Sequence, residues 1–245
     1  MNLQSGAARR TSHKARRTPV IARSAAVAAL ALSLTVGGTT GTSASPAGPA
    51  GGGEAAVSRL AFHDETRKLW EDHITWTRLS IVSFAGELPD LAPTLQRLFR
   101  NQDDLGNSFK PFFGERTGNE LTALLREHIQ GAVDILVAAK AGDRQQLEAA
   151  IAAWYANGEE IADFLSALNP KFWPQDETRA MMREHLDLTL EEATHRLQGD
   201  FEADIQDYDE VHNHILGFAD FLSCGIIKKF PDQFRKHPKA DAICP

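Results

Sequence analysis

The sequence predicts an all-α protein, an antiparallel bundle of about five long helices plus one short helix, on three observations. From Leu60 onward, apolar residues recur at the three- and four-residue spacing of a helix face, and no segment alternates convincingly as a half-buried strand would. Proline, glycine or asparagine interrupts this spacing at intervals that suit helix ends. The predicted connections are mostly short, so consecutive helices should be antiparallel neighbours.

The apolar spacing and its interruptions together place six helices along the chain. They span residues 60–85, 91–100, 119–140, 144–168, 177–198 and 201–229. Pro89, Pro170 and Pro231 follow the first, fourth and sixth helices, because proline cannot continue a helix. Gly142 and Gly199 close the third and fifth helices, since glycine readily adopts the conformation that follows a helix end.

Aspartate begins three of these helices, because its carboxylate can accept a hydrogen bond from the first turn. Asp143, Asp176 and Asp200 stand at the starts of the fourth, fifth and sixth helices. Residues 101–118 are rich in glycine, asparagine and proline, so we expect an irregular segment between the second and third helices.

The first 44 residues predict a secretory signal peptide. They contain six Arg and Lys residues and no Asp or Glu, then an apolar run over Ser24–Val36, then small residues. The run rises only about 20 Å as a helix, short of the roughly 30 Å of a bilayer, so we expect no lasting membrane insertion. Cleavage after Ala44 leaves a flexible leader over 45–58 and a helical domain over 59–245, secreted from the cell. The alternative is a disordered basic tail on a cytosolic protein.

The charge of the remaining chain argues against nucleic-acid binding. Residues 45–245 carry 20 basic and 33 acidic residues, a net charge of −13, with no basic stripe along a helix. Phosphate backbones and anionic membrane surfaces repel such a body. We therefore expect neither nucleic acid nor membrane as a partner, and the sequence does not identify a small-molecule or protein partner.

The chain has two cysteines, too few for a disulfide scaffold or a four-thiolate zinc site. After export, Cys224 and Cys244 could form one disulfide that closes a short loop. A buried free Cys224 is the alternative, and the sequence leaves both open.

Histidines on the apolar faces are the most informative feature for function. His73, His128, His185 and His212 each lie within the apolar arc of a different helix, close to its midpoint, and Asn157 does so on the fourth helix. Midpoints of antiparallel helices lie at one level, so these groups should converge in one layer of the core. Bundles build metal sites in this way from facing helices.

A transition-metal site is one interpretation of this layer. Three neutral imidazoles and a carboxylate suit zinc, copper, iron or manganese, and Glu192 and Asp209 are the candidate carboxylates. The predicted ligands are His73, His128, His185, His212, Glu192 and Asp209. If the protein is an enzyme, an oxidoreductase or a metal-assisted hydrolase fits better than a transferase, because neither needs a nucleotide-binding fold.

The alternative is a non-catalytic secreted binding or structural protein, whose buried polar network only specifies how its helices pack. Under either interpretation, Asn157 should hydrogen-bond the cluster or Arg78, because an unpaired buried amide costs about 1–3 kcal/mol. Glu192 also precedes His195 by three residues, but His195 lies beside exposed charges, so we interpret that pairing as accidental.

The absence of several well-known sequence motifs argues against several enzyme classes. The chain has no P-loop, GxGxxG, GxSxG or HExxH motif, and no Cys-x-x-Cys-His for covalent haem. The run His212-Asn-His214 resembles a nuclease motif only in its letters, because it lies on a predicted helix of an acidic body. We interpret the four tryptophans as packing residues.

Several segments resemble an uncharacterised secreted helical-bundle family of Gram-positive bacteria, over about residues 68–234. The resemblance rests on Leu69-Trp70-Glu-Asp-His73-Ile-Thr-Trp76-Thr77-Arg78, Trp154-Tyr155-Ala-Asn157 and Glu184-His185-Leu-Asp-Leu-Thr189. Members are sometimes labelled glycosyltransferase or acetylglutamate kinase, and nothing in this chain supports either label. The resemblance implies a helical fold over this range and carries no activity to named residues.

Overall fold

A computed structural model describes residues 57–235 and Cys244. The predicted signal peptide, its cleavage site and nearly all of the leader lie outside these residues. The described part contains α1 (Arg59–Ala85), α2 (Leu91–Phe113), α3 (Glu115–Ala141), α4 (Arg144–Leu168), α5 (Gln175–Gln198) and α6 (Phe201–Lys229), with β1 (Val57–Ser58), β2 (Phe234–Arg235) and a short 3-10 turn (Pro231–Gln233). The predicted all-α bundle is confirmed.

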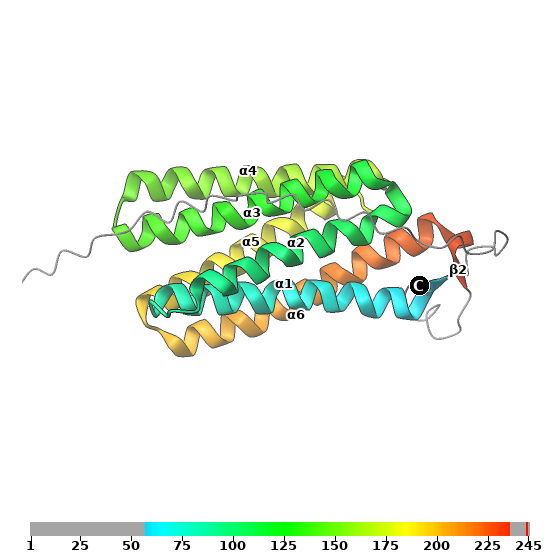
Figure 1. The fold of residues 1–245 in the computed structure, drawn as a ribbon. Helices are drawn as coiled ribbons and strands as arrows, with labels where there is room; N and C mark the ends of the chain where they lie inside the picture. Colours follow the sequence, from blue (N-terminus) through cyan, green and yellow to red (C-terminus); the bar gives the residue numbers. More distant parts are fainter. Residues whose placement is uncertain (1–56, 236–243, 245) are drawn as a thin grey trace, which may run out of the picture. The chain divides into compact units, whose positions relative to one another are not determined.

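Each helix packs against the next one along the chain, and α6 returns to pack against α1 (Figure 1). Short connections make successive neighbours antiparallel, as predicted. The two strands pair in parallel, with Val57 opposite Phe234, so they join the start of α1 to the segment after α6. Within the described residues, no helix combines the length and apolarity needed to cross a bilayer.

The predicted helix ends agree closely with the structure for most elements. Asp143 accepts a hydrogen bond from the backbone N–H of Gln146 over 3.0 Å. Gly142 and Gly199 end α3 and α5 with φ of 68° and 79°, the left-handed conformation that glycine adopts without a steric penalty. Helix α5 begins at Gln175, two residues before the predicted start, so Asp176 lies in its first turn and Pro174 precedes it.

The second helix is longer than predicted, and the expected irregular segment over residues 101–118 is almost wholly helical. Helix α2 continues to Phe113, and Gly114 alone separates it from α3. Two glycines of this segment serve close packing: a Cβ added to Gly118 would lie 2.6 Å from the backbone oxygen of Gly106. Asn101 is fully buried and donates to the backbone oxygen of Leu69 on α1 over 2.9 Å. Composition typical of loops therefore marks a tight helix–helix contact here.

One continuous apolar cluster fills most of the bundle. The structure also shows the state of the two cysteines. Cys224 on α6 and Cys244 form a disulfide, which ties the end of the chain to the last helix. Trp173 is fully buried beside Gly225, where any Cβ would collide with the indole. Trp70, Trp154 and Trp173 are all core residues, in agreement with the packing role predicted for them.

Candidate functional site

All six helices contribute a polar residue to one connected cluster in the core, which we call the histidine layer. Its members are His73 on α1, Gln102 on α2, His128 on α3, Asn157 on α4, His185 on α5 and His214 on α6. As predicted, three of the proposed ligands lie together. His73, His128 and His185 are only 2–4% exposed.

His185 stands at the centre of the layer. Its ring centroid lies 5.6 Å from that of His73, 6.2 Å from that of His128 and 6.3 Å from that of His214. Aromatic side chains enclose the layer: Trp154 stacks on His128 at 5.0 Å, and Trp70 meets His73 edge-on at 5.7 Å. The imidazoles therefore lie in an apolar, water-poor setting.

Side-chain amides orient the two outer imidazoles. Asn157 donates through Nδ2 to the backbone oxygen of Leu124, so its Oδ1 faces Nδ1 of His128 at 3.1 Å. This network assigns the proton to Nδ1 of His128 and leaves Nε2 with a free lone pair. The expected hydrogen bond from Asn157 to the cluster is thereby confirmed.

His73 has the opposite arrangement. Gln102 donates through Nε2 to the backbone oxygen of Leu98 over 2.8 Å, and the same nitrogen lies 3.3 Å from Nδ1 of His73. Nδ1 of His73 therefore accepts a hydrogen bond, and its ring proton belongs on Nε2. A ligand that binds His73 through Nδ1 must displace Gln102.

Burial keeps the three central imidazoles uncharged. It lowers the pKa of His73 to about 3, with a smaller contribution from His128, and the pKa of His128 to about 4. The pKa of His185 is also well below its ordinary value, first through burial and then through the neighbouring histidines. Neutral imidazole is the form that coordinates metals.

Three buried polar atoms in and beside the layer have no hydrogen-bond partner among the described residues. They are Nδ1 of His185, Oε1 of Gln102 and Nε1 of Trp70. Each unpaired group costs about 1–3 kcal/mol, so the fold retains them at the expense of stability. Such atoms are the ones a bound ion or molecule can satisfy.

The structure does not bring His212 or Asp209 into the layer. Val211 and Ile215 face the core on α6, which turns His212 toward the bundle edge, where its Nε2 lies 3.2 Å from Oε1 of Glu71. Asp209 is exposed to solvent. Both residues lie at the border of the apolar arc, where periodicity alone cannot decide which way a side chain faces.

Glu192 is fully buried as predicted, but its partner is Arg78 and not the histidines. Its Oε1 accepts from Nη1 of Arg78 over 2.9 Å, and Arg78 also bonds both carboxylate oxygens of the fully buried Asp204. Seven residues separate Glu192 from His185, about 10 Å along a helix. Burial raises the pKa of Glu192 to about 7, against the opposing effect of Arg78.

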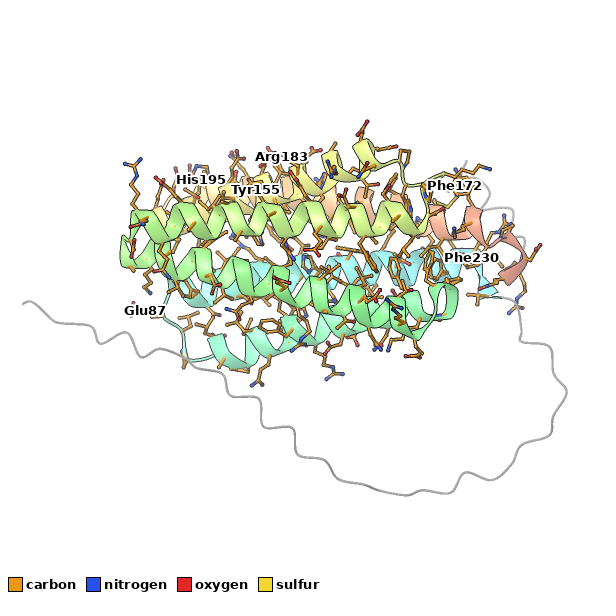
Figure 2. All side chains as sticks on the ribbon, turned by 90° about the horizontal axis from the view of Figure 1, so that it is seen from above. Glu87, Tyr155, Phe172, Arg183, His195 and Phe230 are labelled. Carbon is orange, nitrogen blue, oxygen red and sulfur yellow. A yellow bond between two sulfur atoms is a disulfide. The ribbon has the colours of Figure 1, made fainter. Side chains whose placement is uncertain are left out.

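His195 also pairs elsewhere, as the sequence led us to expect. It lies at the outer edge of the bundle (Figure 2), where its Nδ1 contacts Oδ2 of Asp207 at 2.6 Å. The spacing of Glu192 and His195 therefore has no role in the layer.

His214 is the one histidine of the layer that was not predicted from the sequence. Its Nε2 donates to the backbone oxygen of Met181 over 2.9 Å, and its ring lies nearly parallel to that of His185. The helical spacing did indicate that His214 faces the core, because it follows the buried Val211 by three residues and precedes the buried Phe218 by four. Its Nδ1 lies 3.6 Å from Oε2 of the exposed Glu184, so it connects the layer to the surface.

The imidazoles are spaced more widely than a bound metal ion requires. Within residues 57–235 and Cys244, no group of three or more His, Cys, Asp or Glu side chains is arranged to hold a metal ion. Metal–nitrogen bonds of about 2.0–2.1 Å at a tetrahedral ion put ring centres roughly 5 Å apart. Coordination by this layer would therefore need the rings to rotate and approach one another.

Comparisons of the chain with protein-family models, with curated proteins and with solved structures find no match. Any function proposed for this protein therefore depends on the geometry and chemistry of its own residues.

Proposed function

We propose that the protein is an exported helical-bundle protein that binds a transition metal ion in its core through His73, His128 and His185. One observation carries the proposal: the uncharged imidazoles of His73 and His128, from two other helices, flank the ring of His185, whose buried Nδ1 has no partner. A buried donor set of this kind is unfavourable for folding unless something binds it.

The surroundings of the layer support coordination. Asn157 bonds the Nδ1–H of His128, which is how proteins commonly orient a metal-binding imidazole and raise its basicity. No carboxylate lies in the layer, because Glu192 and Asp209 are engaged or exposed elsewhere. An all-imidazole set suits zinc or copper better than manganese, which prefers oxygen ligands.

A purely structural role is the second candidate. It is favoured by the amide contacts of Gln102 and Asn157, which fix the orientation of His73 and His128 without any metal. In that case the layer would serve only to define how the six helices pack. The two candidates predict different behaviour toward added metal.

Metal titration distinguishes the metal-binding role from the purely structural role. Protein purified without an affinity tag should bind one Zn²⁺ or Cu²⁺ per chain in competition with a chromogenic chelator. His185→Gln should abolish this binding, and Asn157→Leu should weaken it about 10- to 100-fold, as loss of a group that orients a ligand usually does. His212→Gln removes a histidine outside the layer and should bind as the unmodified chain does. Substoichiometric binding, or equal binding by all variants, would leave the structural role.

Export is the other part of the proposal, and it depends on the basic and apolar character of residues 1–44. We expect the protein in its native host to begin near Ser45 and to be found outside the cytoplasm. Mass spectrometry of the intact protein from cell and medium fractions measures both. A native protein that retains Met1 and stays with the cells would contradict export while leaving the metal proposal intact.

A further inference from the structure

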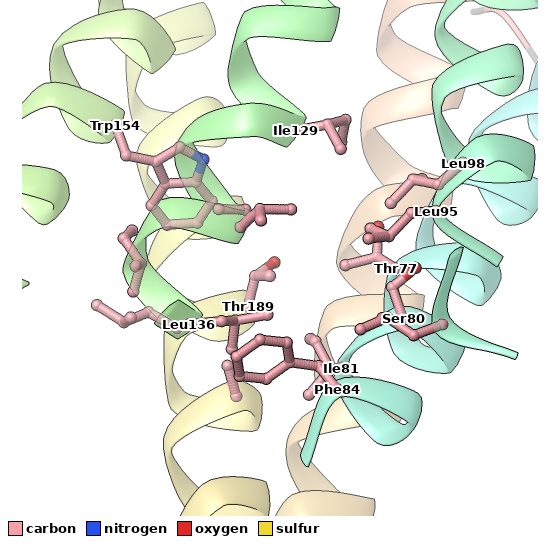
Figure 3. A pocket seen from close by; sticks show the side chains of 16 residues that line it. Thr77, Ser80, Ile81, Phe84, Leu95, Leu98, Ile129, Leu136, Trp154 and Thr189 are labelled. Atoms are coloured by element: carbon pink, nitrogen blue, oxygen red, sulfur yellow. The ribbon is translucent and has the colours of Figure 1, made fainter. Parts of the chain in front are cut away.

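A cavity lies in the core one helical turn from the histidine layer. Its volume is about 50 Å³, and residues of helices α1 to α5 line it (Figure 3). Thr77 and Thr189 line it, four residues after His73 and His185, and Trp154 separates it from His128. The other lining side chains are almost all aliphatic, with Ile129 and Leu136 among them.

The polar groups in the wall of this cavity are already engaged. The hydroxyls of Thr77, Ser80 and Thr189 each donate to the backbone oxygen four residues earlier, over 2.7–2.8 Å. The indole N–H of Trp154 donates to the backbone oxygen of His128 over 3.0 Å. The wall therefore presents methyl and ring surfaces, with no free donor.

We propose that this cavity binds a small uncharged apolar molecule, of the class that includes short hydrocarbons and apolar gases. A single water needs roughly 10–15 Å³, so the space is large enough for water, but a buried water also needs about two to four polar partners. This wall turns almost no polar surface toward the cavity, because the three hydroxyls are directed to their own helix backbones. An apolar guest loses nothing in such a site and gains contacts with side chains that otherwise face a void.

A surface groove adjoins the cavity. The groove lies between α3, α4 and α5, has a volume of about 550 Å³, and shares Ile135, Leu136, Leu190 and Ala193 with the cavity wall. An apolar molecule can therefore approach along aliphatic side chains. This proposal does not depend on metal binding, because no ligand candidate of the layer lines the cavity.

Xenon is the probe of choice, applied under pressure to the metal-free protein while methyl resonances are followed by NMR. We expect saturable shifts at Ile129, Ile135 and Leu136. Ala132→Leu fills the cavity and should weaken xenon binding about tenfold or more, a change of roughly 1.4 kcal/mol. Ala139→Leu is the matched control, because Ala139 lines only the groove, and it should bind xenon as the unmodified chain does.

Two outcomes would overturn the proposal. One is the absence of saturable methyl shifts in the unmodified protein, or shifts that Ala132→Leu leaves unchanged in a folded variant. The other needs no variant: a long-lived water with NOEs to the same methyl groups would show that the cavity is hydrated. Metal titration is independent of both, so failure here and failure of the metal proposal are distinguishable.

Discussion

Lowering the pH from about 6.5 to 4.5 should remove about 5 kcal/mol of stability, because three core histidines stay uncharged while the chain is folded. His73, His128 and His185 have folded pKa values far below 6.5, whereas an unfolded histidine titrates at about 6.5. The unfolded state therefore gains protons in this range and the folded state does not. The stability linked to these neutral histidines is fully present above pH 6.5, the pKa of an unfolded histidine, and is lost as the pH falls below that value.

The size of this effect is about a third or more of the stability of an ordinary domain. Each histidine contributes about 1.4 kcal/mol per pH unit below 6.5. Glu192 acts in the opposite direction, because its raised pKa of about 7 makes the folded state take up a proton as the pH falls. The net loss between pH 6.5 and 4.5 is about 5 kcal/mol, against a typical total of about 5–15 kcal/mol.

Urea unfolding at a series of pH values measures this slope. As the pH is lowered, the free energy of unfolding should fall with a slope that corresponds to the uptake of about two protons on unfolding. His128→Gln should reduce this uptake by about one proton. His212→Gln, which removes a histidine outside the layer, should leave it unchanged. A free energy of unfolding that is flat between pH 6.5 and 4.5 would mean that the core histidines can be protonated in place.

Replacing Arg78 by methionine should destabilise the protein by about 3–5 kcal/mol, because it leaves two buried carboxylates without their common partner. Glu192 and Asp204 are both fully buried, and only Asp204 has a second cation, Arg196 at 3.2 Å. Glu192 has a pKa of about 7 even beside Arg78, so it should be protonated in this variant, and Arg78→Met with Glu192→Gln should lose about as much stability as Arg78→Met alone.

Arg97→Met is the matched control for this prediction. Arg78 lies over the ring of Tyr208, and Arg97 likewise lies over that of Trp76. Arg97 pairs with Asp72 at 3.2 Å, but both side chains of this pair are about 30% exposed. Its loss should cost about 1 kcal/mol or less. Denaturant unfolding at neutral pH compares the variants. Equal losses for Arg78→Met and Arg97→Met would show that the buried pair carries no special weight.

The helices and the core histidines could be predicted because they depend on local periodicity. The spacing of His73, His128 and His185 within their apolar arcs was sufficient to place all three in one layer. His214 satisfied the same rule and was overlooked beside His212, whose position at the edge of the arc made it look equivalent. The prediction was therefore wrong about the angular positions of His212 and His214 around the helix axis.

The partners of these residues could not be predicted, because they come from other helices. Gln102 lies in a segment whose glycine and asparagine content suggested a loop, and only the packing of α2 on α3 explains that composition. Glu192 lies on the same face as His185, but two turns along the axis bring it to Arg78 instead. Whether Cys224 and Cys244 pair was equally open, since it depends on where the chain end lies.

The contact between α1 and α6 has a consequence for how the chain acquires its structure. The last helix covers a face of the first, so the bundle stays incomplete until nearly the whole polypeptide is available. A nascent chain that ends before α6 exposes apolar faces of α1 and α5, the kind of surface that chaperones bind and that promotes aggregation. Closure of the bundle by α6 is thus a late event, because only the packing among α1 to α5 can form before the last helix is available.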